Sequence, residues 1–257
     1  MKKNIELVQG NLTINQKVEG ILKSLALHRI TECYQREAEM AVNTKVSYQE
    51  YLLKLLEEQV TDRIERSINR KMQIAGFPQV KRLEEFDFTY QPKLNESLIR
   101  ELANCSYIGG GVNVIFVGPP GVGKTHLAIA LGIKAVSQRY RVLYTHAQNL
   151  LEQLVAAEAA GVLNKTLDSL SRYDLLIIDE LGYLSFTKDA SRIFFQLVSK
   201  KYEKTSCIVT TNKPFELWGE IFNDEIVASA ILDRLLHHSH PVLISGKSFR
   251  MKNILDN

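Results

Sequence analysis

The chain has 257 residues, of which 45% are hydrophobic and 24% charged, the balance of an ordinary globular protein. Its net charge of +3 neither favours nor excludes nucleic acid as a partner, and its length allows one large domain or two smaller ones. The three cysteines lack metal-ligand or disulfide spacing, the basic N-terminus lacks the apolar core of a signal peptide, and no apolar run reaches the ~20 residues of a membrane span. We therefore expect a cytoplasmic protein with no membrane partner.

The first part of the chain carries only helical patterns. From Asn15 to Met72 apolar residues recur at helical spacing, and no segment alternates as a strand would. Ser47 and Glu50 have the spacing of a capping box at the start of the second helix. We expect two long helices with minor turns, which form a small all-α domain over residues 1–75.

A linker and a second domain, residues 76–257, follow. Gly76, Pro78 and Pro92 interrupt the helical periodicity, and Asn95 is expected to cap a helix that runs to about Asn104. Beyond it, short apolar runs alternate with helical patterns. This alternation is typical of a parallel sheet covered by helices on both faces, so the predicted fold class is α/β. The apolar runs are residues 113–117, 141–146, 174–179 and 206–211.

A glycine-rich segment, GPPGVGKT at residues 118–125, follows the first apolar run and opens a helical pattern. It fits the phosphate-loop motif in full, in which glycines let backbone amides turn toward an anion and the helix N-terminus adds a positive dipole end. Lys124 is expected to contact the β and γ phosphates of ATP, and the Thr125 hydroxyl to bind Mg²⁺. The predicted nucleotide contacts are Gly118, Pro119, Pro120, Gly121, Val122, Gly123, Lys124, Thr125 and His126.

Two later strands end in polar residues suited to ATP hydrolysis. The run LLIIDE ends in Asp179, expected to contact nucleotide and to reach Mg²⁺ through water, and in Glu180, the candidate general base. Nucleotide carriers and kinases seldom place a carboxylate at the second position, so Glu180 favours a hydrolase. Asn212 ends the next strand and is expected to hold the attacking water or contact the γ phosphate. The candidate catalytic groups of this chain's own loop and strands are Lys124, Glu180 and Asn212.

These motifs in this order resemble those of the AAA+ ATPases. The stretches GPPGVGKTHLAIALG, DLLIIDELGYL, TTNKPFELWGEIF and AILDRLLHHSH more narrowly resemble the IstB-like family, the ATPase helpers of insertion-sequence transposases, and its relative DnaC, the helicase loader. The resemblance covers nearly the whole chain. It implies an AAA+ P-loop NTPase domain with a parallel sheet flanked by helices, preceded by the small helical domain and without a separate C-terminal lid domain.

The resemblance also implies roles for residues outside the three motifs. AAA+ proteins bind ATP between subunits, and Arg234 falls where a neighbour's arginine finger completes the site; by itself it would be interpreted as a helix-surface arginine. Arg250 matches a second arginine that senses nucleotide in cis or in trans. Phe86, Phe88 and Gln91 lie where the family brings the linker near the adenine, with Phe88 the predicted contact, although phenylalanines at a domain joint are also typical of a core.

A basic row on the second helix suggests nucleic acid as a partner. Arg63, Arg66 and Arg70 have the spacing of one helix face and Lys71 extends the row, which suits salt-dependent contacts with phosphates but also a solvated face. The resemblance favours double-stranded DNA, which the family clamps and bends. It further implies a homo-oligomer assembled with ATP and the transposase of the same element as a partner. The alternatives are a DnaC-type helicase loader and a nucleotide-gated DNA-binding scaffold with little catalysis.

Three histidines, His237, His238 and His240, crowd together near the end of the chain. Adjacent histidines at a helix end point in different directions, and no cysteine or carboxylate cluster joins them in the sequence. The sequence therefore favours a helix C-terminus that accommodates positive charge over a metal site.

Overall fold

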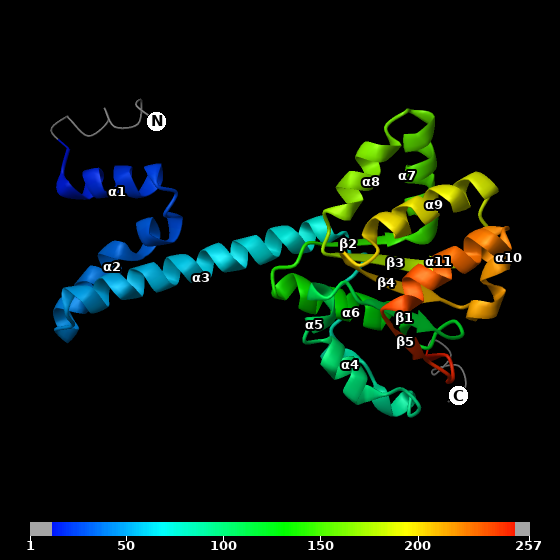
Figure 1. The fold of residues 1–257 in the computed structure, drawn as a ribbon. Coiled ribbons are helices and arrows are strands. Elements are labelled where there is room, and N and C mark those ends of the chain that lie inside the picture. Colours follow the sequence, from blue (N-terminus) through cyan, green and yellow to red (C-terminus); the bar gives the residue numbers. More distant parts are fainter. Residues whose placement is uncertain (1–11, 250–257) are drawn as a thin grey trace. The chain divides into compact units, whose positions relative to one another are not determined.

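The computed structural model describes residues 12–249, and the chain divides into two compact units between Asn69 and Arg70 (Figure 1). The division lies within one helix, α3 (Tyr48–Ala75), whereas the predicted domain boundary after residue 75 lies at the end of this helix. Arg250 lies outside the described residues. Among the helices of residues 12–249, none is both long and apolar enough to cross a membrane.

The N-terminal unit consists of helices, as predicted, but the first predicted long helix is divided in two. It forms α1 (Ile14–Ser24) and α2 (His28–Thr44), which precede α3. The chain turns at Ala26, whose φ of 55° lies in the left-handed region, while Leu27 N donates to the Leu22 carbonyl over 2.9 Å. This is a helix-terminating motif that glycine usually provides, so the sequence carried no signal for it.

The predicted capping box at the start of α3 is confirmed. The backbone N–H of Glu50 donates to Ser47 Oγ over 3.2 Å, and the backbone N–H of Ser47 donates to Glu50 Oε2 over 2.8 Å. Two backbone donors at the helix start are thus satisfied reciprocally. The small core beneath these helices is formed by Ile30, Cys33, Tyr34 and Leu55.

The C-terminal unit is built on a five-stranded sheet in the order β2-β3-β4-β1-β5, and every pairing in it is parallel. The α/β prediction is confirmed, and four strands overlap the predicted apolar runs. The fifth, at one edge of the sheet, was not predicted because its sequence SHPVL is short, contains a proline and is largely not buried. The strands are β1 (Asn113–Val117), β2 (Val142–His146), β3 (Leu175–Leu181), β4 (Ser206–Thr211) and β5 (Ser239–Leu243).

Helices cover both faces of this sheet, with α6 on one face and α9 and α11 on the other (Figure 1). Gly132 lets α6 approach the sheet closely, because a Cβ there would lie 2.6 Å from Ile177 Cδ1. The opposite face holds the main core, in which Leu176 and Ile178 pack with Phe194 and Ile231. The helices are α4 (Glu96–Leu102), α5 (Ser106–Gly109), α6 (Lys124–Ser137), α7 (Ala147–Ala159), α8 (Leu163–Ser171), α9 (Lys188–Lys201), α10 (Trp218–Phe222) and α11 (Glu225–His237).

The linker between α3 and α4 contains two short 3-10 helices, η3 (Leu83–Glu85) and η4 (Phe88–Tyr90). The predicted cap of α4 is confirmed, since Asn95 Oδ1 accepts from Leu98 N over 3.1 Å. Because the sheet is parallel, the carboxyl ends of β1, β3 and β4 lie together along the same end of the strands. This is the usual position of a ligand site in such folds.

Candidate nucleotide-binding site

The glycine-rich segment forms the connection between β1 and α6, as predicted. Lys124 is the first residue of α6, and its side chain folds back over the loop, where Nζ donates to the carbonyls of Gly118 (2.7 Å) and Pro119 (2.8 Å). The residue is only 7% exposed. The loop thus holds a buried ammonium group at the N-terminus of a helix, an arrangement that favours an anion.

At Gly118 and Gly123 of this loop, neighbouring atoms lie too close for a residue with a Cβ. A Cβ on Gly118 would lie 2.2 Å from the Ile244 carbonyl oxygen, after β5. Gly123 has a φ of 99°, and its Cβ would lie 2.5 Å from Phe86 Cε2, a ring that comes from the linker. The linker therefore packs directly on the phosphate loop, and His126 also contacts it through Nε2, 2.8 Å from the Arg82 carbonyl.

Asp179, in β3, is completely buried and is held by three hydroxyl groups. Thr125 Oγ1 donates to Oδ1 over 3.0 Å, Tyr144 Oη to Oδ2 over 2.6 Å, and Thr210 Oγ1 to Oδ1. Burial and the neighbouring Asp179 carboxylate raise the pKa of Tyr144 far above its ordinary value, so its hydroxyl stays a donor. The Thr125 hydroxyl and the Asp179 carboxylate together supply the oxygen ligands that Mg²⁺ prefers, and the residues present fit this ion.

Glu180 follows directly but lies in a different environment. Its φ of 63° is left-handed, and the pairing of β3 with β4 shifts register between Ile178 and Leu181, so this residue leaves the ladder. Its side chain is 46% exposed, and its backbone N–H donates to Thr210 Oγ1 over 2.9 Å. One carboxylate is therefore fixed inside the protein, while the next can reach a bound ligand.

Sequence analysis missed a histidine beside these carboxylates. His146 ends β2, and its Nδ1 lies 3.3 Å from Glu180 Oε2 and 4.0 Å from Asp179 Oδ2. Tyr144 and Thr210 were missed as well. The available signal was their position near the carboxyl ends of strands that flank β3, although only the strand order shows that they are neighbours.

A pocket with a volume of about 250 Å³ lies between the phosphate loop and the linker. Phe86 and Gln91 line it together with Lys124, Thr125 and Glu180. Gln91 Nε2 donates to the Lys247 carbonyl over 3.1 Å, whereas its buried Oε1 has no hydrogen-bond partner among the described residues. A polar acceptor beside an aromatic ring suits a purine base.

Phe88, the predicted adenine contact, does not line this pocket. Its ring packs edge-on against Phe86, with centroids 4.9 Å apart, and the Arg100 guanidinium lies over it at 5.7 Å. Asn212 directly follows β4 but is also absent from the pocket lining. Its buried Oδ1 has no hydrogen-bond partner within residues 12–249.

Arg234 lies away from this chain's own nucleotide pocket. It sits on α11, where its guanidinium carbon is 4.4 Å from the centroid of the Phe195 ring and Nη1 donates to the Ala230 carbonyl over 3.1 Å. Its contacts among the described residues are thus with an aromatic ring and a backbone carbonyl of its own helix.

The predicted DNA contacts fall in both units. Arg63 and Arg66 are exposed on α3, and Arg66 forms an ion pair with Asp62 at 2.8 Å. In the C-terminal unit Arg70 is exposed, whereas Lys71 is half-buried and donates to the Arg139 carbonyl. Lys71 and Arg66 thus already have structural contacts, while Arg63 and Arg70 are exposed.

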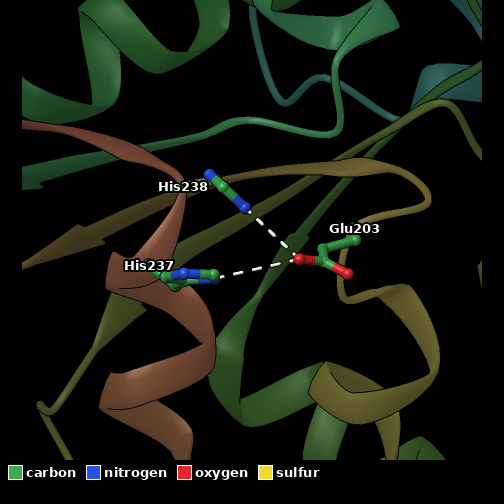
Figure 2. A group of neighbouring side chains, drawn as sticks. All are labelled: Glu203, His237 and His238. Atoms are coloured by element: carbon green, nitrogen blue, oxygen red, sulfur yellow. Dashed lines mark ion pairs between the residues drawn. The ribbon is translucent and has the colours of Figure 1, made fainter.

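The interpretation of the histidines needs one correction. The sequence showed no carboxylate near them, but Glu203 lies against both His237 and His238, as Figure 2 shows. Glu203 is far from both in sequence, and the packing of α9 beside α11 brings them together.

A parallel sheet with a phosphate loop after one strand and an Asp-Glu pair on another defines a P-loop nucleotide-binding protein of the AAA+ type. Solved structures with this fold include the DnaC helicase loader (TM-score 0.50, 24% identity, 58% of this chain and 86% of that chain covered). Another is AMPPCP-bound DnaA from Aquifex aeolicus (TM-score 0.55, 24% identity, 70% and 55% covered). These likenesses show the fold.

Sequence comparison identifies the family. The model of the family described as IstB-like ATP binding protein matches residues 20–256. A relative from Pseudomonas aeruginosa, named as an ATP-binding protein of insertion sequence IS21, is 42% identical over 236 residues (92% of this chain and 89% of the relative). One from Geobacillus stearothermophilus, named for insertion sequence IS5376, is 38% identical over 239 residues (93% and 95%). The chain therefore belongs to the IstB-like ATP-binding protein family.

Proposed function

We propose that this protein hydrolyses ATP, assembles with further copies on double-stranded DNA, and guides a transposase to its target site. The family and its insertion-sequence relatives support the biological context. The observation that supports hydrolysis is the position of Glu180, an exposed carboxylate on the pocket wall beside Lys124 and Thr125.

In the proposed reaction ATP binds with its phosphates in the loop. Lys124 Nζ then donates to a phosphate oxygen in place of a loop carbonyl. Thr125 and, through water, Asp179 would hold Mg²⁺, which would neutralise charge on the phosphates. Glu180 accepts a proton from the water that attacks the γ phosphorus, and the bond to the bridging oxygen breaks, which leaves ADP and phosphate. We assign the orientation of this water to Asn212, which directly follows β4 and whose buried Oδ1 has no hydrogen-bond partner among the described residues.

The proposed assembly explains two features of the chain. Arg234 is absent from the lining of its own chain's pocket, so we assign it to the nucleotide of a neighbouring copy, where it stabilises charge on the phosphoryl group. Exposed Arg63 and Arg66 supply contacts with DNA phosphates, which position a protein on a duplex without reading its sequence. Deformation of the bound duplex would then mark a site for the transposase.

Electron microscopy of the purified protein with duplex DNA tests this proposal. We expect filaments or rings around DNA with ATP, and dispersed protein with ADP, without nucleotide, or with ATP and the Lys124→Ala variant. Equal assembly on DNA in all four samples would contradict nucleotide control.

A helicase loader is the alternative with the same fold. The named relatives favour the transposition helper, because the insertion-sequence proteins are 42% and 38% identical to this chain, whereas the loader is 24% identical. ATP hydrolysis measured with the transposase of the same element, and separately with a replicative helicase, distinguishes them. Stimulation by the helicase alone would favour the loader.

A further inference from the structure

A cluster outside the nucleotide pocket combines the side chains that bind transition metals. Glu203, His237 and His238 offer one oxygen and two nitrogens, and these three atoms lie within 4.8 Å of one another. His238 Nε2 is 3.3 Å and His237 Nδ1 is 3.9 Å from the same Glu203 oxygen, Oε1 (Figure 2). In a tetrahedral site with bonds of about 2.0 Å, neighbouring ligand atoms are about 3.3 Å apart. Small side-chain movements would therefore complete coordination.

The backbone that carries the two histidines is anchored to the sheet. His237 ends α11, and the His238 carbonyl accepts from the backbone N–H of Asn113, at the start of β1, over 2.8 Å. The Asn113 side chain also donates to the Leu235 carbonyl in the last turn of α11 over 3.1 Å. The histidines are thus positioned before any ligand binds, which lowers the entropy cost of binding.

The carboxylate comes from an ordered turn on the neighbouring element. Glu203 follows α9 and has a left-handed φ of 57°. Its backbone packs against Gly111, where a Cβ would lie 3.1 Å from the Glu203 carbonyl carbon. A left-handed backbone is uncommon for a residue other than glycine. The packing of this turn therefore sets the position of the Glu203 side chain.

We propose that Glu203, His237 and His238 bind a divalent transition-metal ion, for which Zn²⁺ is the best fit. Imidazole nitrogens suit Zn²⁺, whereas Mg²⁺ and Ca²⁺ require more oxygen ligands. The three side chains are 48–54% exposed, so the ion has access from solvent and a water can take the fourth position. The competing explanation is a metal-free ion pair between Glu203 and a protonated histidine.

A bound ion would link two elements of the C-terminal unit. It would tie the turn after α9 to the last turn of α11, and Arg234 lies one helical turn before His237. The inference does not depend on ATP hydrolysis, because binding is measured without nucleotide.

The test is a calorimetric titration of the full-length, tag-free, metal-stripped protein with ZnCl₂ in excess MgCl₂. We expect the wild type to bind one equivalent of Zn²⁺ saturably. The affinity for Zn²⁺ should be at least tenfold lower in His238→Ala and in Glu203→Gln. His28→Ala, in the N-terminal unit, is the matched control and should bind like the wild type. Zn²⁺ should also raise the Tm of the wild type but not of the two variants, and in EDTA all should share the wild-type Tm.

The Tyr202 hydroxyl, 2.6 Å from His237 Nδ1, provides a sharper test. A metal ion on Nδ1 must displace this hydroxyl, so Tyr202→Phe should bind Zn²⁺ at least as tightly as the wild type. The proposal is overturned if the wild type shows no saturable binding, if binding is undiminished in both ligand variants, or if Tyr202→Phe abolishes it. If His146→Ala no longer binds the one equivalent of Zn²⁺, the ion lies at the nucleotide site, and the proposal is also overturned.

Discussion

Two adjacent carboxylates receive different roles from their surroundings. Asp179 is buried among hydroxyl donors, whereas Glu180 lies at the register shift between β3 and β4, with a left-handed backbone and a half-exposed side chain. A carboxylate held by several donors is fixed and suited to binding a cation's hydration shell. The other is free to meet water in the pocket, as a general base must.

Replacing Glu180 tests this division of roles. Glu180→Gln should lower kcat for ATP hydrolysis by about 10²–10⁴-fold, the usual contribution of a general base, and change ATP affinity little. Phosphate release and equilibrium nucleotide binding measure the two effects. Glu216→Gln, an exposed residue outside the pocket, is the matched control. Unchanged turnover in Glu180→Gln would leave a nucleotide-gated scaffold as the better description.

Gly123 is where the linker touches the phosphate loop. Gly123→Ala should weaken ATP binding at least about tenfold, because the new methyl group meets Phe86 and the backbone is strained at a φ of 99°. Gly161→Ala adds similar strain at a φ of 70° but has no atom within 4 Å of the new Cβ. Titration with a fluorescent ATP analogue compares them. Equal affinity in both variants would show that the contact with Phe86 is unimportant.

At the scale of elements, hydrogen bonds between Arg141 and Asp174 join the beginnings of β2 and β3. The Asp174 carboxylate, just before β3, accepts from Arg141 N over 2.7 Å and from Arg141 Nη2 over 2.7 Å. Burial acts to raise the pKa of Asp174, but the hydrogen bonds and charge of Arg141 outweigh it and hold this pKa below its ordinary value. The contact fixes the start of the strand whose other end carries Asp179.

The lowered pKa gives this contact a pH signature. Because the folded pKa lies below the unfolded value, the stabilisation is present at pH values above the unfolded pKa and is lost as the pH falls through the folded pKa. At pH 7, Asp174→Asn should reduce the free energy of unfolding by about 1 kcal/mol. Urea unfolding at pH 7 and pH 3 should show this difference shrinking at the lower pH. Asp168→Asn removes a more exposed carboxylate (59%) that pairs with Lys200 and should have almost no effect, and an equal loss in both variants would contradict the argument.

At the scale of the whole molecule, we expect the nucleotide site to be complete only when a second copy contributes Arg234. The pocket is lined by the phosphate loop, Glu180 and the linker, but not by Arg234. Mixing Arg234→Ala with Lys124→Ala subunits tests this arrangement. Each variant alone should hydrolyse ATP at least about a thousandfold more slowly than the wild type, and the mixture should recover part of the activity. A mixture as inactive as its components would argue that Arg234 acts only within its own subunit.

The sequence by itself determined the phosphate loop, the Asp179-Glu180 strand end, the α/β class and four of the strands. These features depend on local spacing and periodicity, which short-range sterics and burial translate directly into structure. It could not show that the first long helix is divided at Ala26, because an alanine there gives no sign of a left-handed turn.

Only the tertiary structure decided which distant residues meet. The strand order places His146 and Thr210 on either side of the β3 end, and the linker sets Phe86, not Phe88, on the phosphate loop. The packing of α9 beside α11 brings Glu203 to the two histidines. Such contacts arise from the burial of whole faces of helices and sheets, so no local pattern around any one of these residues encodes them.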